Sequence, residues 1–280
     1  MEKEISVLMS VYKNDVPKYL KEALDSIVNQ TYKAKEIIIV IDGPISEELS
    51  AVLNEYALNY PEIKLHKLEK NMGLGIAMNE GTKLCNCDYI ARMDSDDISE
   101  LNRFEKQIEA FNNDETLSVV GSNSREFVDG KKDEGYLKVV PEKHKDICEF
   151  MKSRCPICHP SLMIKKEMLL SSGGYKDWFY AEDWYLCIRM YLNGAKFYNV
   201  QENLLNVRLN EDTYIRRSGL KYYKSIKKLL KYMKDNKIIG FFKYTKEKIK
   251  RFIGHVLIPK KLKNKLYRKF MRKKQNAGKH

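Results

Sequence analysis

DYIARMDSDD, residues Asp88–Asp97, joins a short apolar run to three carboxylates within four residues. The apolar part predicts a buried strand, so Asp94, Asp96 and Asp97 come at a strand end. Carboxylates this close repel one another unless a cation or a hydrogen-bonding ligand lies between them. Carboxylate oxygens are ligands that Mg²⁺ and similar hard cations prefer. The sequence therefore predicts a divalent metal, Mn²⁺ or Mg²⁺, that holds an anionic ligand here.

The residues before this run alternate between strand-like and helix-like segments. Apolar runs predict strands at Glu4–Val11, Glu36–Ile41 and Ile63–Leu68. Apolar residues at helical spacing predict helices over Pro17–Asn29, over a segment that Ser46 caps, and over Gly73–Leu84. This alternation is typical of an α/β fold, with a mostly parallel, Rossmann-like central sheet flanked by helices.

Polar side chains follow each of these strands. They are Ser10 and Tyr12 after the first strand, Asp42 after the second, Asn71 after the third, and Asp94–Asp97, here called the acidic run, after the fourth. Ligands bind such sheets at the carboxyl ends of the strands, so we expect these side chains to line one crevice. Any single one of them could be ordinary loop chemistry, and the prediction depends on the whole set.

The second half of the chain is less regular. Strands are predicted at Leu117–Ser122, His159–Ile164, Lys196–Val200 and Leu204–Arg208. Glu182 and Asp183 open a helical stretch that runs to Leu192, where they could merely complement the helix dipole. We expect one α/β unit over residues 1–214, with halves at 1–100 and 101–214.

Two common nucleotide-binding motifs are missing from the sequence. No GxxxxGK[ST] loop occurs, and the Asn71–Gly81 segment lacks the third glycine of a dinucleotide fingerprint. A nucleotide would therefore be held by a metal and by strand-end side chains.

Cys155-Pro156-Ile157-Cys158-His159 matches both a haem-attachment pattern and half of a zinc site. Cys85 and Cys87 are spaced as CxC, which does not supply the second zinc-ligand pair. We expect ordinary thiols in the reduced state. No apolar run approaches the roughly 20 residues of a membrane span, and no leader segment precedes the first strand. The expected location is therefore cytoplasmic.

Charge is distributed unevenly along the chain. The formal net charge is +13, but residues 215–280 hold 24 Lys and Arg against Asp235 and Glu247, and the rest of the chain is net acidic. Apolar residues recur among these lysines at helical spacing; they are Tyr223, Ile226, Leu230 and Met233, then Ile238, Phe241, Phe242, Ile249, Phe252 and Ile253, and after Pro259, Leu262, Leu266 and Phe270.

Basic amphipathic helices of this kind are typical of segments that bind an anionic membrane surface. The alternatives are helices that pack on the rest of the protein, or a nucleic-acid interface. No recognisable nucleic-acid-binding module supports the last alternative. We expect 215–280 to be a membrane-associating helical tail, with the protein peripheral on the inner face of the plasma membrane and without a nucleic-acid partner.

Several segments together resemble the family 2 glycosyltransferases with the GT-A fold. They are Ile5–Tyr12, Ser26–Tyr32, Glu36–Pro44, Asn71–Gly81, Asp94–Asp97 and Ala181–Trp184. Each segment alone is a weak signal, but their order and spacing over residues 5 to about 210 are specific. The resemblance implies a nucleotide-sugar-binding half at 1–100 and an acceptor-binding half at 101–214.

The resemblance also implies roles for individual residues. Ser10, Tyr12 and Asp42 match positions that hold uracil and ribose, and Asn71 lies in a matching segment. Asp94 and Asp96 match the DXD motif, which binds the ribose and the sugar diphosphate of the donor. Asp96 and Asp97 match the positions that bind the metal. Asp183 matches the catalytic base. Ile41 departs from the pattern, because many relatives carry an Asp there.

Three further residues are candidates near the acceptor. Glu182 adjoins the predicted base, and Trp184 could stack on an acceptor sugar or pack in the core. His159 could touch the diphosphate or merely cap a strand.

The implied reaction is metal-dependent transfer of a sugar from a UDP-sugar to an acceptor hydroxyl. The metal stabilises the leaving diphosphate, and a single carboxylate base inverts the anomeric configuration. Bacterial enzymes of this kind commonly extend lipid-linked saccharides of the cell surface, so we expect a lipid-linked acceptor. Two other hypotheses are a nucleotidyltransferase and a membrane-docked nucleotide-sugar-binding protein without turnover.

Overall fold

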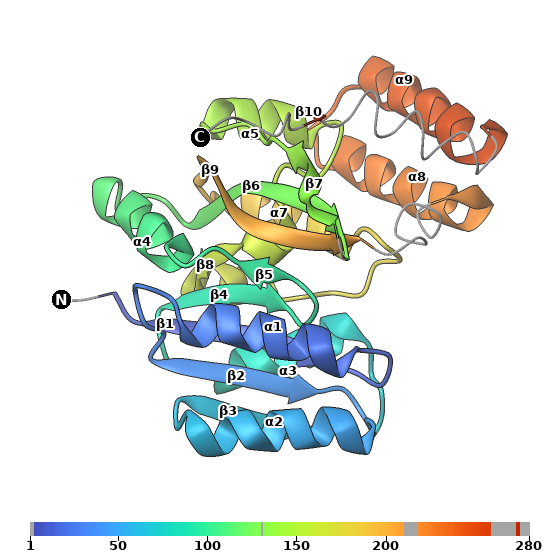
Figure 1. The fold of residues 1–280 in the computed structure, drawn as a ribbon. Helices are drawn as coiled ribbons and strands as arrows, with labels where there is room; N and C mark the ends of the chain where they lie inside the picture. Colours follow the sequence, from blue (N-terminus) through green and yellow to red (C-terminus); the bar gives the residue numbers. More distant parts are fainter. Residues whose placement is uncertain (1–2, 130, 210–217, 259–272, 275–280) are drawn as a thin grey trace.

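A twisted sheet with helices on both faces forms the centre of the molecule (Figure 1). The computed structural model describes residues 3–129, 131–209, 218–258 and 273–274. The strands are β1 (Ile5–Val11), β2 (Glu36–Ile41), β3 (Ile63–Lys67), β4 (Tyr89–Asp94), β5 (Ile98–Ser99), β6 (Val119–Val128), β7 (Lys131–Lys138), β8 (Met163–Lys165), β9 (Phe197–Leu209) and β10 (Lys273–Lys274). The main sheet has the order β10-β7-β6-β8-β4-β1-β2-β3.

The N-terminal half of the sheet is parallel, as the sequence predicts. β1 lies between β2 and β4, and β3 extends the sheet beyond β2. Strand β2 is buried along its whole length, which its run of branched apolar residues requires. The register places Ser10 directly opposite Asp94, so the carboxyl ends of β1 and β4 meet.

The C-terminal half of the sheet is mixed. β8 runs antiparallel to both β4 and β6, whereas β9 runs parallel to β6 and antiparallel to the short β5. β5 begins directly after the acidic run, and its pairing of Ile98 with Asn206 holds the end of that run against β9.

Helices cover the two sheet faces with separate cores. They are α1 (Pro17–Val28), α2 (Glu47–Asn59), α3 (Leu74–Leu84), α4 (Arg103–Asn113), α5 (His144–Met151), α6 (Lys166–Ser171), α7 (Glu182–Leu192), α8 (Gly219–Asp235) and α9 (Phe241–Phe252). Apolar residues of α1, α2 and α4 fill one core, and those of α3, α5, α6, α7 and α8 fill the other. The Ser46 hydroxyl caps α2 by accepting from the Leu49 N–H, as predicted.

Three predicted elements differ from the structure. His159–Ile164 is not one strand, because His159–Ser161 forms a 3₁₀ turn and only Met163–Lys165 pairs. Pro160 offers no N–H to a sheet ladder, which explains the turn. Lys196–Val200 and Leu204–Arg208 form one continuous strand, β9, whose register against β6 shifts near Asn123.

Helix α8 belongs to the folded core. Its apolar side chains, Tyr222, Ile226, Leu229, Leu230 and Met233, are buried in the core that contains α7. The boundary expected at 214 lies outside the described residues, as do Leu262, Leu266 and Phe270. None of the described helices combines the length and apolar character that crossing a membrane requires.

Candidate active site

The acidic run forms a compact group of carboxylates at the end of β4. Asp94, Asp96 and Asp97 each offer an oxygen, and these oxygens all lie within 4.8 Å of one another. The Arg208 N–H donates to Asp97 Oδ1 at 2.9 Å, whereas Asp97 Oδ2 is buried and has no hydrogen-bond partner. An orphaned buried carboxylate oxygen beside two other carboxylates suits a hard divalent cation. The described residues thus fit a metal here.

Burial makes the carboxylates of Asp96 and Asp97 hard to ionise. Burial, and then the charges of neighbouring Asp residues, raise the pKa of Asp96 to about 7. The same causes raise the pKa of Asp97 well above its ordinary value. A cation between the carboxylates would favour their ionised forms.

Asp15 is a fourth carboxylate at this site, and the sequence analysis missed it. Its Oδ2 accepts from the Ser95 hydroxyl at 2.8 Å and from the Tyr12 N–H at 3.0 Å. Burial raises the pKa of Asp15 to about 6. The available signal was its place in the loop after the first strand, three residues beyond Tyr12.

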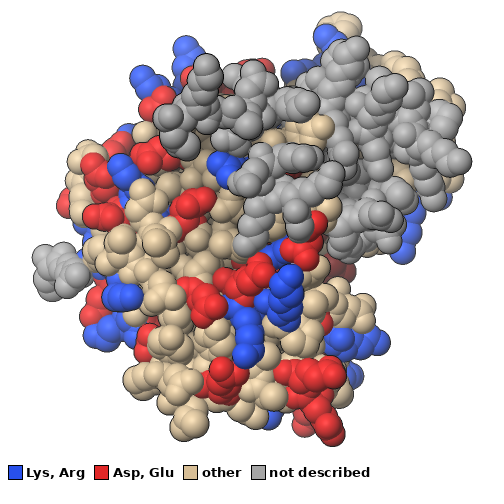
Figure 2. Space-filling view, viewed as in Figure 1, with Lys and Arg blue, Asp and Glu red and all other residues tan. Residues whose placement is uncertain are grey.

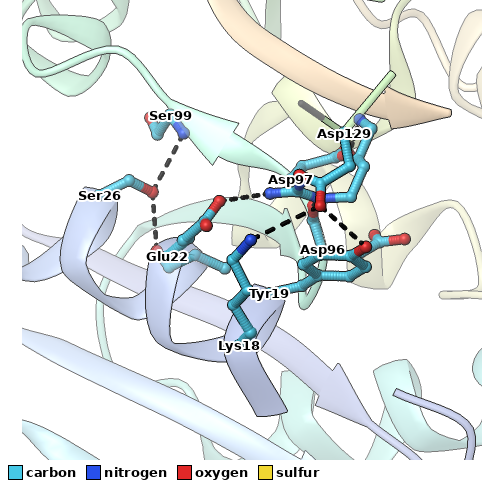
Figure 3. Close-up of polar contacts among 10 residues, drawn as sticks. Lys18, Tyr19, Glu22, Ser26, Asp96, Asp97, Ser99 and Asp129 are labelled. Carbon is cyan, nitrogen blue, oxygen red and sulfur yellow. Dashed lines mark hydrogen bonds and ion pairs between the residues drawn. The ribbon is translucent and has the colours of Figure 1, made fainter. Parts of the chain in front are cut away.

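Arg208 connects the acidic run to helix α1. Its guanidinium pairs with Glu22 of α1 and with Asp129, and its Nε donates to the Asp96 carbonyl at 3.0 Å. Tyr19 and Lys18 also reach Asp129, so these side chains enclose one side of the acidic run (Figure 3). Arg208 is therefore paired with carboxylates of α1 and of the residue just after β6 in this structure.

Two further arginines lie under the acidic run. The Arg92 guanidinium is buried and pairs with Asp94, but its Nε and Nη1 have no hydrogen-bond partner. Arg103 donates to the Arg92 carbonyl at 2.7 Å, and burial lowers its pKa to about 9. Acidic and basic side chains also lie next to one another near the middle of the face in Figure 2.

The predicted strand-end residues occupy different environments. Ser10 pairs in register with Asp94, and the Tyr12 side chain is exposed. Both Asp42 oxygens accept backbone N–H groups, from Met72 at 2.6 Å and from Gly73 at 3.0 Å. Asn71 donates to the Asp42 carbonyl at 3.2 Å.

Asp42 therefore braces the Asn71–Gly73 segment against the end of β2, in addition to any contact with a ligand. Gly43 has a φ of +86°, and a Cβ at this position would lie 2.4 Å from the Asn71 nitrogen. Glycine is thus required where the two segments approach.

Asp183 lies at the start of α7, where its Oδ1 accepts from the Trp184 N–H at 2.7 Å. Among the described residues, no hydrogen bond or ion pair joins Asp183 to the acidic run. The loop before α7 is held by α3, because the Asn79 amide bonds both the N–H and the carbonyl of Tyr175. Glu182 is half-buried at the first position of α7.

The remaining candidates lie deeper. Trp184 is buried in the core and its indole N–H donates to the Met151 carbonyl at 2.9 Å. His159 is half-buried, and its ring lies 5.8 Å from that of Tyr175. All six cysteines are free thiols, and among the described residues only the acidic run forms a group able to hold a metal.

The raised carboxyl pKa values predict an unusual pH dependence of stability. The pKa of Asp96 is about 7 in the folded chain and near 3.8 in the unfolded chain. Between these two pH values the folded state therefore binds more protons than the unfolded state. The metal-free protein should therefore have a lower Tm at about pH 8 than at about pH 6. Mn²⁺ should raise Tm more at the higher pH. Thermal melts of the protein and of Asp96→Asn test this, and an unchanged pH dependence in the variant would contradict it.

Comparisons with known proteins identify the family and the fold of the chain. The profile of the family described as Glycosyl transferase family 2 matches residues 6–169. A UDP-Gal:alpha-D-GlcNAc-diphosphoundecaprenol beta-1,3-galactosyltransferase of Escherichia coli is 37% identical, over 78% of this chain and 79% of that protein. The amylovoran biosynthesis glycosyltransferase AmsE of Erwinia amylovora is 35% identical, over 94% of this chain and 98% of its own length.

Solved structures show the same fold at low sequence identity. TarS 1–349 of S. aureus, in complex with UDP-GlcNAc, superposes with a TM-score of 0.67 at 17% identity over 90% of this chain and 73% of that chain. The chain spans 44% of the longer TarS chain. The mannosyltransferase PcManGT of Pyrobaculum calidifontis has a TM-score of 0.62 at 16% identity over 91% of this chain and 70% of its own. The predicted GT-A fold is confirmed, and the chain belongs to glycosyl transferase family 2.

Proposed function

We propose that this glycosyltransferase moves a sugar from a UDP-sugar to a hydroxyl of a lipid-linked saccharide, with inversion and with a divalent metal, in cell-surface polysaccharide synthesis. The observation that carries the proposal is the group of Asp94, Asp96 and Asp97, whose oxygens converge at the end of β4. Sugar transfer from a nucleotide donor requires stabilisation of a departing diphosphate, and a cation held by these oxygens would provide it.

Each residue of the site has a distinct task in this proposal. Asp96 and Asp97 hold Mn²⁺ or Mg²⁺, which neutralises charge on the leaving diphosphate when bound. Asp94, fixed by Arg92 and opposite Ser10, contacts the donor ribose. Tyr12, with an exposed side chain after β1, contacts the base. Asp42 and Asn71 shape the neighbouring segment.

Asp183 acts as general base toward the acceptor hydroxyl. It lies at the start of α7, and the Asn79–Tyr175 bonds hold the preceding loop against α3. A carboxylate within hydrogen-bond reach of the nucleophile can take its proton during attack. Direct attack opposite the diphosphate inverts the anomeric centre without a covalent intermediate.

The relatives support the acceptor class. The Escherichia coli relative is named for transfer to a sugar on diphosphoundecaprenol, and the Erwinia relative for amylovoran biosynthesis. The Escherichia coli relative, 37% identical over 78% of this chain, makes a lipid-linked saccharide the first acceptor class to test. The Erwinia relative, 35% identical over 94% of this chain, supports a role in polysaccharide synthesis.

Release of UDP tests the proposed reaction. The full chain is incubated with a panel of UDP-sugars, Mn²⁺ and a GlcNAc-diphospholipid acceptor, and UDP is measured with and without the acceptor. We expect acceptor-dependent UDP release from one donor, abolished by EDTA. Pyrophosphate release would instead favour a nucleotidyltransferase, and donor binding without turnover on any acceptor would favour a binding protein.

A further inference from the structure

Helix α9 and the turn after it expose an apolar face that the described part of the chain does not cover. Phe242 is 88% exposed, Phe241 66%, Leu257 60% and Ile249 53%, and Ile253 is also exposed. Phe242, Ile249 and Ile253 follow one another at spacings of seven and four residues, which places them on one side of a helix. These five residues are called the α9 outer face.

The opposite side of α9 is anchored to the enzyme. Glu247 is buried and bonds the Ser153 hydroxyl at 3.5 Å, and Arg251 donates to the Ser153 carbonyl. The Arg251 guanidinium also lies 5.6 Å from the centre of the Trp184 ring. Because these contacts fix the rotation of α9 about its axis, the outer face is presented to the surroundings in one orientation.

The charges around the α9 outer face are almost all positive. Lys243, Lys246, Lys248 and Lys250 share α9 with a single acidic residue, Glu247, which lies on the anchored side and pairs with Lys250 at 3.7 Å. The other acidic residue between 218 and 258, Asp235, is paired with Lys231 at 2.5 Å. A surface that combines exposed Phe, Ile and Leu with flanking lysines complements an anionic lipid surface.

We propose that the α9 outer face docks on an anionic membrane, with Phe241 and Phe242 inserted among the lipid headgroups. Helix α8 does not take part through its apolar stripe, because that stripe is buried in the core. The membrane-binding segment expected over 215–280 is thereby narrowed, among the described residues, to α9 and the turn Ile253–Leu257. A second copy of a chain with this many lysines on the same face would be repelled, which disfavours self-association.

The position of α8 connects this surface to the catalytic loop. Ser225 of α8 donates to the Phe179 carbonyl at 2.7 Å and accepts from the Trp178 indole at 3.3 Å. Trp178 and Phe179 lie in the loop that leads into Asp183. Figure 1 shows α8 and α9 side by side, on the side of the molecule toward which the arrow of β2 points. Docking would then present the loop before Asp183 to a lipid-borne acceptor. This consequence rests on the proposed function, whereas the docking itself does not.

Vesicle co-sedimentation tests the docking surface without any donor, metal or acceptor. The full-length protein is mixed with phosphatidylcholine vesicles containing about 30% phosphatidylglycerol, or with phosphatidylcholine alone. We expect binding to the anionic vesicles that weakens with salt, and at least about tenfold weaker binding by the double variant Phe241→Asp, Phe242→Asp. Leu58→Asp is the control, because Leu58 is 85% exposed on α2 and also exchanges an exposed apolar side chain for a carboxylate, although it adds one negative charge where the double variant adds two.

Three results would overturn the proposal. The first is equal vesicle binding by the double variant and the control, and the second is equal binding to neutral and anionic vesicles. The third is a parent protein that is dimeric in solution and binds no vesicles, with the double variant monomeric. UDP release with a water-soluble acceptor is measured in parallel as a check on folding. Failed docking with intact turnover contradicts only this inference, and failed turnover with intact docking contradicts only the proposed reaction.

Discussion

Replacing Asp183 by Asn should lower kcat by about 10²–10⁴ while leaving donor binding nearly unchanged. The amide keeps the size of the side chain and can still accept the Trp184 N–H through its oxygen, so α7 should begin at the same residue. It cannot accept a proton at neutral pH, and the attacking hydroxyl would lose its base. Steady-state UDP release, together with UDP-sugar binding measured by calorimetry, separates the two effects.

Two neighbouring variants are the controls for this result. Asp177→Asn removes an exposed carboxylate from the same loop and should leave kcat within about twofold of the parent. Glu182→Gln tests which residue of the Glu182-Asp183 pair is the base. A larger loss from Glu182→Gln than from Asp183→Asn would transfer the assignment to Glu182.

Replacing Asp96 and Asp97 together by Asn should abolish metal-dependent turnover. Loss of the cation removes several kcal/mol of stabilisation from the leaving diphosphate, which corresponds to about a hundredfold or more in rate. The same variant should be more stable than the parent in the absence of metal at about pH 8, because the buried carboxylates no longer have to ionise.

A loss of activity together with a gain of stability in this double variant would show that Asp96 and Asp97 bind the metal, because loss of a structural role would lower both quantities. Asp88→Asn is the matched control, since Asp88 is exposed just before the other end of β4 and should affect neither quantity. Titration with Mn²⁺, followed by the rise in Tm, measures metal binding directly. Retention of the full Mn²⁺ response by the double variant would refute the assignment of Asp96 and Asp97 as the metal site.

The parallel half of the sheet was predictable because its signals are local. The apolar run of β2 can only be satisfied in a strand buried on both faces, and the Ser46 cap fixes the start of α2. The prediction of a strand over His159–Ile164 was wrong, because Pro160 interrupts the segment and His159–Ser161 forms a 3₁₀ turn. Strand β7 was not predicted, since Tyr136 and Leu137 are too few apolar residues to show a period. Helix α5 was not predicted either, because it is only eight residues long, although Ile147, Phe150 and Met151 stand at helical spacing.

The sequence by itself determined the α/β class and the position of the acidic run, because strand periodicity and clustered carboxylates are readable along the chain. Its motifs, in their order and spacing, also carried the resemblance to family 2 glycosyltransferases. Only the tertiary structure showed that Asp15 and Arg208, which lie far from that run in sequence, enclose it. The tertiary structure alone also showed that the two basic C-terminal helices differ, because the apolar stripe of α8 is buried and that of α9 is exposed. The physical reason is that both helices carry the same pattern of lysines and apolar residues, and which stripe meets the core depends on the surface that the rest of the fold offers.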